Sequence, residues 1–256
     1  MNVTELFSLE GRSALVTGGS RGIGMMIAHG FLSQGARVYI TSRKAAACDA
    51  AAKELSAYGE CRSLPADVST MEGIRDLVGR YAEFEHKLDV LVNNAGAAWG
   101  EPIDTFTEAG WDKVMDLNVK TPFFLTQACK PMLTRQPNEP RSKVINIASI
   151  DGISVNPQET YSYQASKAGV IQLTRRMALR LIDDGIVVSG IAPGAFASQM
   201  NRVARDHGDE LSNHIPAGRI GRPEDMAAAA VYLASQAGDY VVGSTIVVDG
   251  GVTHSR

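Results

Sequence analysis

The stretch SALVTGGSRGIGMMIAHGFLSQG, residues 13–35, contains in order a strand, a glycine-rich turn and a helix. Residues 13–17, SALVT, form a short apolar run of the kind found in buried strands. Residues 22–35 have the apolar pattern of a helix, and Gly35 marks its end. The segment TGGSRGIG at 17–24, called the glycine turn below, joins the two. This order predicts the first unit of a parallel sheet covered by helices.

The rest of the chain repeats this alternation. Further strands are expected at the start of 61–68 and at 37–41, 88–96, 143–149, 186–194 and 244–251. Helices are expected at 44–58, 71–85, 111–133, 161–184 and 223–235, with Pro122 and Pro131 as points where the third one bends or ends. Such alternation favours a doubly wound, Rossmann-type α/β sheet of about seven parallel strands with helices on both faces. No linker interrupts the pattern, so residues 1–256 are expected to form a single dinucleotide-binding domain.

Composition excludes several classes of function. The chain has 256 residues, 45% hydrophobic and 21% charged, with a formal net charge of −3. This gives no reason to expect a nucleic acid or an anionic membrane as partner. No apolar run is long enough to span a bilayer, and the N-terminus lacks the apolar core of a signal peptide. Cys48, Cys61 and Cys129 are widely spaced and, like the five histidines, form no metal motif. A cytoplasmic protein without a metal site is therefore expected.

The glycine turn predicts a phosphate-binding site. Gly18, Gly22 and Gly24 have the spacing G-x3-G-x-G. Glycines at such positions let the backbone approach a pyrophosphate at the N-terminus of the following helix. The alternative is a glycine-rich turn without a ligand.

The residues after the second strand indicate the cofactor. Dinucleotide folds place an acid there to bind ribose hydroxyls, whereas an arginine accommodates a 2′-phosphate. Here Ser42, Arg43 and Lys44 follow the strand, and Arg21 lies inside the glycine turn. A guanidinium binds phosphate through two charge-assisted hydrogen bonds, so NADP(H) is expected rather than NAD(H). The alternative is that these cations are solvated surface residues.

Motifs spread over nearly the whole chain resemble those of the short-chain dehydrogenases/reductases. They are the glycine turn, ADV at 66–68, NNAG at 93–96, Y-x-x-x-K at 163–167, PGAFAS at 193–198, GRIGRPEDMA at 218–227 and VDGG at 248–251. The resemblance implies catalytic roles for Asn118, Ser149, Tyr163 and Lys167. Together with the glycine turn it gives as cofactor contacts Gly18, Ser20, Arg21, Gly22, Ile23, Gly24, Ser42, Arg43, Asp67, Val68, Asn94, Ala95, Gly96, Tyr163, Lys167, Pro193, Gly194, Phe196 and Ser198.

The segment ETYSYQASK at 159–167 contains two tyrosines, and only one shares a helix face with the lysine. A helix turns about 100° per residue, so Tyr163, four residues before Lys167, lies nearly on its face. Tyr161, six residues before Lys167, lies roughly 240° away. The alternative for the Tyr163–Lys167 pair is an ordinary helix-surface contact.

The family's reaction is hydride transfer between a nicotinamide and a carbonyl carbon, with a proton delivered to the oxygen. A free tyrosine has a pKa of about 10, and lowering it by about 3 units requires about 4 kcal/mol. Lys167 and an oxidised nicotinamide are expected to supply this together. Ser149 is expected to hydrogen-bond the substrate oxygen. Asn118 is expected to act indirectly through a water near Lys167, or else as a buried asparagine bonded to nearby backbone. Asp151 is a further carboxylate near Ser149, which loop polarity also explains.

The substrate is less constrained by the sequence. The polar segment at about 195–217 is expected to form a lid. Candidate pocket residues are apolar and suit an acyl chain or a hydrophobic ketone, unless they are ordinary packing: Trp99, Ile153, Val155, Phe196 and Met200. Within the family, GGSRGIG, LSAYG, NNAG-x-x-WG and INIAS are similar to the 3-oxoacyl thioester reductases, particularly those of rhamnolipid synthesis.

One position departs from the reductases that act on acyl carrier protein. They commonly keep a basic residue where this chain has Asp183 and Asp184, and these carboxylates would repel an acidic carrier protein. Arg141 matches another basic docking position. The family resemblance also implies a homo-oligomer, a dimer or a tetramer.

Three activities remain open. The first is NADPH-dependent reduction of a ketone, most simply a 3-oxoacyl thioester, to a secondary alcohol. The second is an alcohol or polyol dehydrogenase that works oxidatively. The third is a nucleotide-binding regulator without catalysis, against which the presence of both Tyr163 and Lys167 counts.

Overall fold

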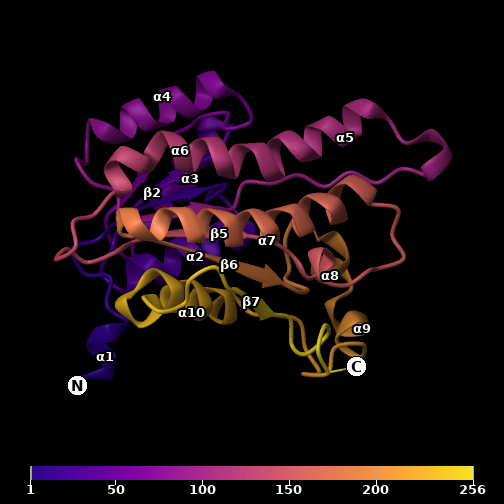
Figure 1. Cartoon of the computed structure of the whole chain (residues 1–256). Coiled ribbons are helices and arrows are strands. Elements are labelled where there is room, and N and C mark those ends of the chain that lie inside the picture. Colours follow the sequence, from indigo (N-terminus) through magenta and orange to yellow (C-terminus); the bar gives the residue numbers. More distant parts are fainter. Residues whose placement is uncertain (1, 200, 256) are drawn as a thin grey trace.

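The computed structural model describes residues 2–199 and 201–255, without the side chains of residues 202 and 203. Its centre is a sheet of seven parallel strands in the order β3-β2-β1-β4-β5-β6-β7 (Figure 1). The strands are β1 (Ser13–Thr17), β2 (Arg37–Thr41), β3 (Cys61–Ser63), β4 (Val90–Asn93), β5 (Ser142–Ile147), β6 (Ile186–Pro193) and β7 (Thr245–Val248). The predicted doubly wound α/β fold is confirmed, and β1 and β2 have the bounds expected from the sequence.

Helices cover both faces of the sheet. One face packs against α2 (Gly22–Ser33), α3 (Ala45–Leu55) and α10 (Pro223–Ala234). The other face packs against α4 (Met71–Ala82), α6 (Thr121–Leu133) and α7 (Tyr161–Leu181). Strands buried on both faces need apolar residues throughout, and every residue of β1 and β6 is buried.

Shorter elements lie at the ends of this framework. The short α-helices are α1 (Val3–Leu6), α5 (Glu108–Met115), α8 (Arg202–Asp206) and α9 (Gly208–Ser212). Single turns of 3₁₀ helix are η1 (Ile103–Thr105), η3 (Ile150–Gly152), η4 (Ile182–Asp184) and η5 (Gln236–Gly238). In Figure 1, α8 and α9 lie beyond the arrowheads of β6 and β7, at the carboxyl edge of the sheet.

The helical run expected at 111–133 is confirmed, but it begins earlier and contains a π turn. The helix begins at Glu108, where the Thr107 hydroxyl accepts a hydrogen bond from the Gly110 N–H. A π turn, η2 (Asp116–Lys120), then separates α5 from α6. Pro122 lies in the first turn of α6, directly after the π turn, and the helix continues through it. Pro131 also lies inside α6 and does not end it.

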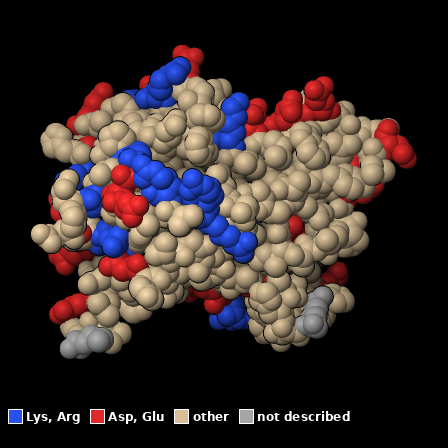
Figure 2. All heavy atoms as spheres, viewed as in Figure 1, with Lys and Arg blue, Asp and Glu red and all other residues tan. Residues whose placement is uncertain are grey.

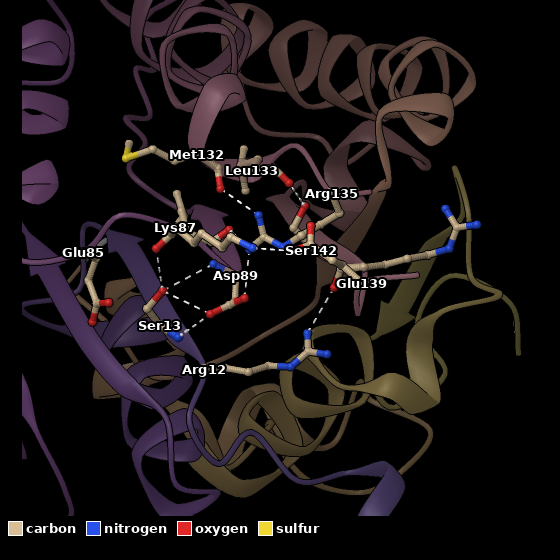
Figure 3. Close-up of polar contacts among 12 residues, drawn as sticks. Arg12, Ser13, Glu85, Lys87, Asp89, Met132, Leu133, Arg135, Glu139 and Ser142 are labelled. Atoms are coloured by element: carbon tan, nitrogen blue, oxygen red, sulfur yellow. Dashed lines mark hydrogen bonds and ion pairs between the residues drawn. The ribbon is translucent and has the colours of Figure 1, made fainter. Parts of the chain in front are cut away.

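A buried polar network closes the amino edge of the sheet (Figure 3). The Asp89 carboxylate accepts hydrogen bonds from the Ser13 N–H (2.9 Å), the Ser13 hydroxyl (3.2 Å) and the Arg135 guanidinium (2.9 Å). Arg135 is buried and also donates to the carbonyls of Leu88 and Met132. These bonds join the starts of β1 and β4 to the end of α6, on the side of the sheet away from the carboxyl edge.

Candidate active site

The predicted site residues come from separate segments that meet at the carboxyl edge of the sheet. The glycine turn follows β1, the NNAG segment includes the end of β4, Ser149 follows β5, and the PGAFAS segment follows β6. In a parallel α/β sheet this edge is where ligands bind.

The glycine turn has no room for side chains at its critical positions. Gly22 has φ +54, a left-handed conformation that favours glycine. A Cβ added at Gly24 would lie 2.5 Å from the Asn94 side-chain nitrogen. In the described structure no side chain caps the first turn of α2. The first N–H groups of α2 are therefore suited to a phosphate.

Thr17, which was not among the predicted site residues, joins the glycine turn to the NNAG segment. Its hydroxyl accepts hydrogen bonds from the N–H groups of Asn94 and Ala95, both at 2.9 Å, and donates to the Val92 carbonyl. The Asn94 side chain donates to the carbonyls of Thr17 (2.8 Å) and Gly18 (3.3 Å). The sequence signal that could have identified Thr17 is a threonine at the end of the strand that precedes the glycines.

Two predicted cofactor residues, Arg21 within the glycine turn and Ser198 after β6, lie where these two segments meet. The Arg21 guanidinium donates a hydrogen bond to the side-chain oxygen of Gln199. A Cβ added at Gly22 would lie 3.3 Å from the Ser198 Cβ. The segment after β6 therefore lies against the start of α2.

The remaining predicted cofactor residues lie in the glycine turn or at and beyond the carboxyl ends of strands. Ser42 and Arg43 directly follow β2, and Arg43 is exposed. The Asp67 carboxylate accepts from the Ser69 N–H (3.0 Å) and hydroxyl (2.6 Å), and the carbonyl of buried Val68 accepts from Thr121. Further members of the set are placed as follows: Ser20 and Ile23 are partly buried in the turn and at the start of α2, Pro193 ends β6, and the Gly194 N–H donates to Val248.

The catalytic candidates Ser149, Tyr163 and Lys167 are gathered in one place. Ser149 and Lys167 are buried, and Ser149 hydrogen-bonds the Tyr163 phenol. The Lys167 amine lies 5.6 Å from the centre of the Tyr163 ring and donates to the Ile147 carbonyl at 2.8 Å. A Cβ added at Gly96 would lie 3.8 Å from the Lys167 nitrogen, so the NNAG segment reaches the same site.

Tyr161 points away from this group. Its hydroxyl donates to the Glu159 carboxylate at 3.0 Å, and its ring packs edge-on against Phe106 with centroids 5.7 Å apart. Of the two tyrosines, only Tyr163 lies with Ser149 and Lys167.

Burial controls the ionisation of the site. Burial raises the pKa of Tyr163 to about 12, partly opposed by the hydrogen bond with Ser149, and Asp151 raises it further. Burial lowers the pKa of Lys167 to about 8, with Asp151 opposing this shift. In these side chains by themselves, burial outweighs any lowering of the Tyr163 pKa by Lys167, because the phenolate is poorly solvated here. The expected lowering by Lys167 together with an oxidised nicotinamide stays a prediction.

Asn118 lies in the π turn and uses its side chain to fix the NNAG segment. It accepts from the Ala97 N–H (2.8 Å) and donates to the Ala97 carbonyl (2.9 Å) and the Ser166 hydroxyl (2.9 Å). Of the two arrangements expected for Asn118, this is the second one, a buried asparagine bonded to nearby backbone.

The candidate pocket residues do not form one pocket. The Phe196 ring is 2% exposed and packs over Gly221, which fits ordinary packing. Trp99 packs against Gly110 on α5. Ile153 and Val155 are exposed beside the Ser149 turn. Met200 lies outside the described residues.

The described residues contain neither a helix that could span a membrane nor a cluster that could bind a metal ion. No helix there is long and apolar enough to cross a membrane. No cluster of three or more histidine, cysteine, aspartate or glutamate side chains there is arranged to hold a metal ion.

The family follows from the fold, this site and a sequence match. Residues 18–253 match the family model described as enoyl-(acyl carrier protein) reductase. The chain belongs to the short-chain dehydrogenases/reductases, a family of oxidoreductases, which confirms the predicted resemblance.

Two curated relatives and one solved structure are similar to this chain over nearly its whole length. The chain is 49% identical over 249 residues to a rhamnolipids biosynthesis 3-oxoacyl-(acyl-carrier-protein) reductase of Pseudomonas aeruginosa, covering 96% of this chain and 97% of that protein. It is 37% identical to a gluconate 5-dehydrogenase of Gluconobacter oxydans, covering all of both chains. The solved NADP active-site complex of Pseudomonas aeruginosa RhlG superposes with a TM-score of 0.93 at 47% identity, covering 99% of this chain and 100% of that one.

Proposed function

We propose that this protein reduces a ketone to a secondary alcohol with NADPH, and that its substrates are 3-oxoacyl thioesters or related hydrophobic ketones. The observation that carries the proposal is the grouping of Tyr163, Ser149 and Lys167 beside the NNAG segment, which also contacts the glycine turn. The 49% identity to a 3-oxoacyl reductase supports this substrate class.

Each member of the group has a role in the proposed reaction. When bound, the nicotinamide supplies the hydride. The Ser149 hydroxyl hydrogen-bonds the substrate oxygen and stabilises the charge that develops there. Tyr163 donates the proton to that oxygen. With a pKa of about 12 its phenol is protonated at neutral pH, which is the form that reduction requires.

Lys167 and Asn118 support this chemistry. The Lys167 amine has donors beyond its bond to Ile147, and we assign them to the nicotinamide ribose and the phenol. With a pKa of about 8 the amine is mostly charged at neutral pH. Because the Asn118 side chain is committed to Ala97 and Ser166, we assign its effect to holding the NNAG segment, with any water near Lys167 held by the backbone.

The residues present fit NADP(H). The uncapped N-terminus of α2 suits the pyrophosphate, and the close approach at Gly24 keeps side chains out of that space. Arg43, exposed at the end of β2 where NAD enzymes place an acid, is assigned to the 2′-phosphate. Asp67 is assigned to the adenine, and Pro193, Gly194 and Ser198 to the nicotinamide side.

The segment at 195–217, which includes α8 and α9, is proposed to close over the substrate as a lid. Its contact with the glycine turn through Arg21 and Gln199 places its start beside the cofactor site. Ile153 and Val155 present exposed apolar surface next to Ser149, which suits an acyl chain.

An acyl carrier protein remains a candidate partner. The Asp184 carboxylate, expected to repel it, is paired with Arg180 (2.9 Å) and Lys130 (3.2 Å). Figure 2 shows lysine and arginine side chains gathered where α6 and α7 end. Their positive charge offsets the negative charge of Asp183 and Asp184. A homo-oligomer is proposed through α6, α7 and β7, and the three free cysteines fit a reducing cytoplasm.

The second candidate is an alcohol or polyol dehydrogenase that works oxidatively, which the identity to gluconate 5-dehydrogenase favours. A substrate panel separates the two. NADPH oxidation is measured with acetoacetyl thioesters, free and on carrier protein, and NADP⁺ reduction with polyols and sugar acids. Activity confined to the polyols and sugar acids would favour the second candidate.

Paired variants test the site. Tyr163→Phe should keep NADPH binding and lose turnover by orders of magnitude, because it removes the donated proton. Tyr161→Phe should keep turnover, because that hydroxyl faces Glu159. Equal losses from the two changes would contradict the assignment of Tyr163.

A further inference from the structure

The turn that follows Ser149 brings a fixed carboxylate to the catalytic group. Ser149 caps η3, and its hydroxyl accepts a hydrogen bond from the Asp151 N–H at 3.1 Å. The next residue, Gly152, lies so close to α7 that an added Cβ would be 2.5 Å from the backbone carbon of Lys167. The backbone of Asp151 is therefore fixed on one side by its bond to Ser149 and on the other by the close contact of Gly152 with α7.

The Asp151 side chain is fixed as well as its backbone. The Asn156 amide donates to an oxygen of the Asp151 carboxylate at 2.7 Å, and Asn156 is itself held by a bond from the Gln158 N–H. Asp151 is partly buried, so its charge is less screened than at the surface. A loop carboxylate present only for polarity needs no such anchoring.

The ionisable groups around Asp151 are those of the catalytic site. The η3 turn packs against α7, which supplies Tyr163 and Lys167, and against β6, which contains no ionisable side chain. Tyr161 and Glu159 bond to each other outside this group. The negative charge of Asp151 raises the pKa of both Tyr163 and Lys167, which favours the phenol and the ammonium.

We propose that Asp151 is a positioning residue of the reaction, which acts through the Tyr163–Lys167 pair and disfavours substrates with an anionic group one carbon beyond the reacting carbonyl. This inference rests on the proposed function of the site. It extends that function because a neutral ester or thioester is preferred to a free acid of the same length. The carboxylate gives this preference by like-charge repulsion.

The test uses Asp151→Asn, which keeps an oxygen for Asn156 and removes the charge. In the direction of alcohol oxidation, turnover rises with pH as Tyr163 loses its proton. The positive charge of a bound oxidised nicotinamide lowers the pKa of Tyr163, so this rise occurs at a lower pH than in the free protein. Removing the carboxylate should move the rise further to lower pH, by about one unit. Asp151→Glu should restore the wild-type profile in part. Asp183→Asn, at the far end of α7, should leave the profile unchanged.

The substrate preference is measured with acetoacetate and methyl acetoacetate, a matched anion and neutral ester. Asp151→Asn should lower the KM of the anion relative to that of the ester by roughly tenfold. An unmoved pH profile together with an unmoved KM ratio would overturn the inference, even if the variant were slower.

A second measurement does not depend on turnover. The ultraviolet absorbance of the Tyr163 phenolate is titrated as the difference between each protein and its Tyr163→Phe counterpart. The midpoint should fall in Asp151→Asn, and an unchanged midpoint would overturn the inference. If the wild-type protein turns over no substrate of the panel, the proposed function fails, and this titration still tests the role of Asp151.

Discussion

Replacing Gly152 with alanine is predicted to separate the Ser149 turn from α7. The added Cβ would lie 2.5 Å from the Lys167 carbonyl carbon and 2.7 Å from the Ala168 nitrogen. Ordinary contact begins at 3.4 Å, so one side must move by about 0.9 Å, the difference between 3.4 Å and 2.5 Å. Both neighbouring atoms belong to the backbone of a long helix, so no flexible side chain can absorb the movement.

This displacement has an expected cost in rate and in stability. Misplacing reacting groups by about 1 Å costs on the order of 100-fold in rate. Overpacking a tight contact costs about 1–3 kcal/mol of unfolding free energy, which lowers Tm by roughly 2–10 °C. We therefore expect kcat for NADPH-dependent ketone reduction to fall about 100-fold. The assay is NADPH absorbance at saturating substrate, with Tm measured on the same samples.

Gly79→Ala is the matched control. Gly79 lies in α4, and a Cβ there would have no atom within 4 Å. Alanine at this helical position should raise stability by up to about 1 kcal/mol and leave kcat unchanged. A Gly152→Ala protein with the kcat and Tm of the wild type would refute the argument that this contact sets the distance between Ser149 and Lys167.

Four further results are expected. Arg43→Asp should shift the ratio of kcat/KM values toward NADH by about tenfold or more, because a charged phosphate ligand is lost; an unchanged ratio would exclude Arg43 as that ligand. Thr17→Val should cost about 2 kcal/mol in urea unfolding, because the partly buried Ala95 N–H loses its acceptor and the Asn94 N–H keeps only the Val92 carbonyl; Thr41→Val should cost little, because the buried Thr41 hydroxyl has no partner among the described residues. Stability should fall as pH rises above about 9, because burial raises the pKa of Cys61 and Cys129 to about 12 and the folded chain keeps protons that the unfolded chain releases; equal urea midpoints at about pH 8 and about pH 10 would contradict this. Sedimentation at micromolar concentration should show a dimer or a tetramer, and a monomer would contradict the proposed assembly.

The sequence predicted the fold well where the signal is local. Strands β1 and β2 are short apolar runs bounded by turn residues, and their bounds match the expectation. The helix after the glycine turn also follows from its apolar spacing. The grouping of Tyr163 with Lys167 follows from the helical period alone.

Features that depend on distant contacts were not predictable. The π turn at 116–120 contains Asn118, whose side chain bonds to Ala97, a residue 21 positions earlier. The pKa of Tyr163 depends on how fully the fold surrounds the phenol, and the sequence did not show that burial would raise it. Phe196 was a candidate pocket residue, but its ring packs over Gly221, which lies 25 positions later in the chain.

The π turn constrains how this chain can change in length. Each residue of an α-helix advances the direction of its side chain by about 100°. A π turn accommodates one additional residue within a helix, so deleting one residue from Asp116–Lys120 would let the backbone return to regular α geometry with α5 and α6 still facing the same way. Deleting one residue from the first turn of α6, by contrast, would rotate the rest of that helix by this angle. Leu125, Cys129 and Leu133 would then leave the sheet together. The π turn can therefore absorb a change of one residue in length, whereas α6 beyond it must keep its length, and Asn118 within the turn must keep its side chain to bond Ala97 and Ser166.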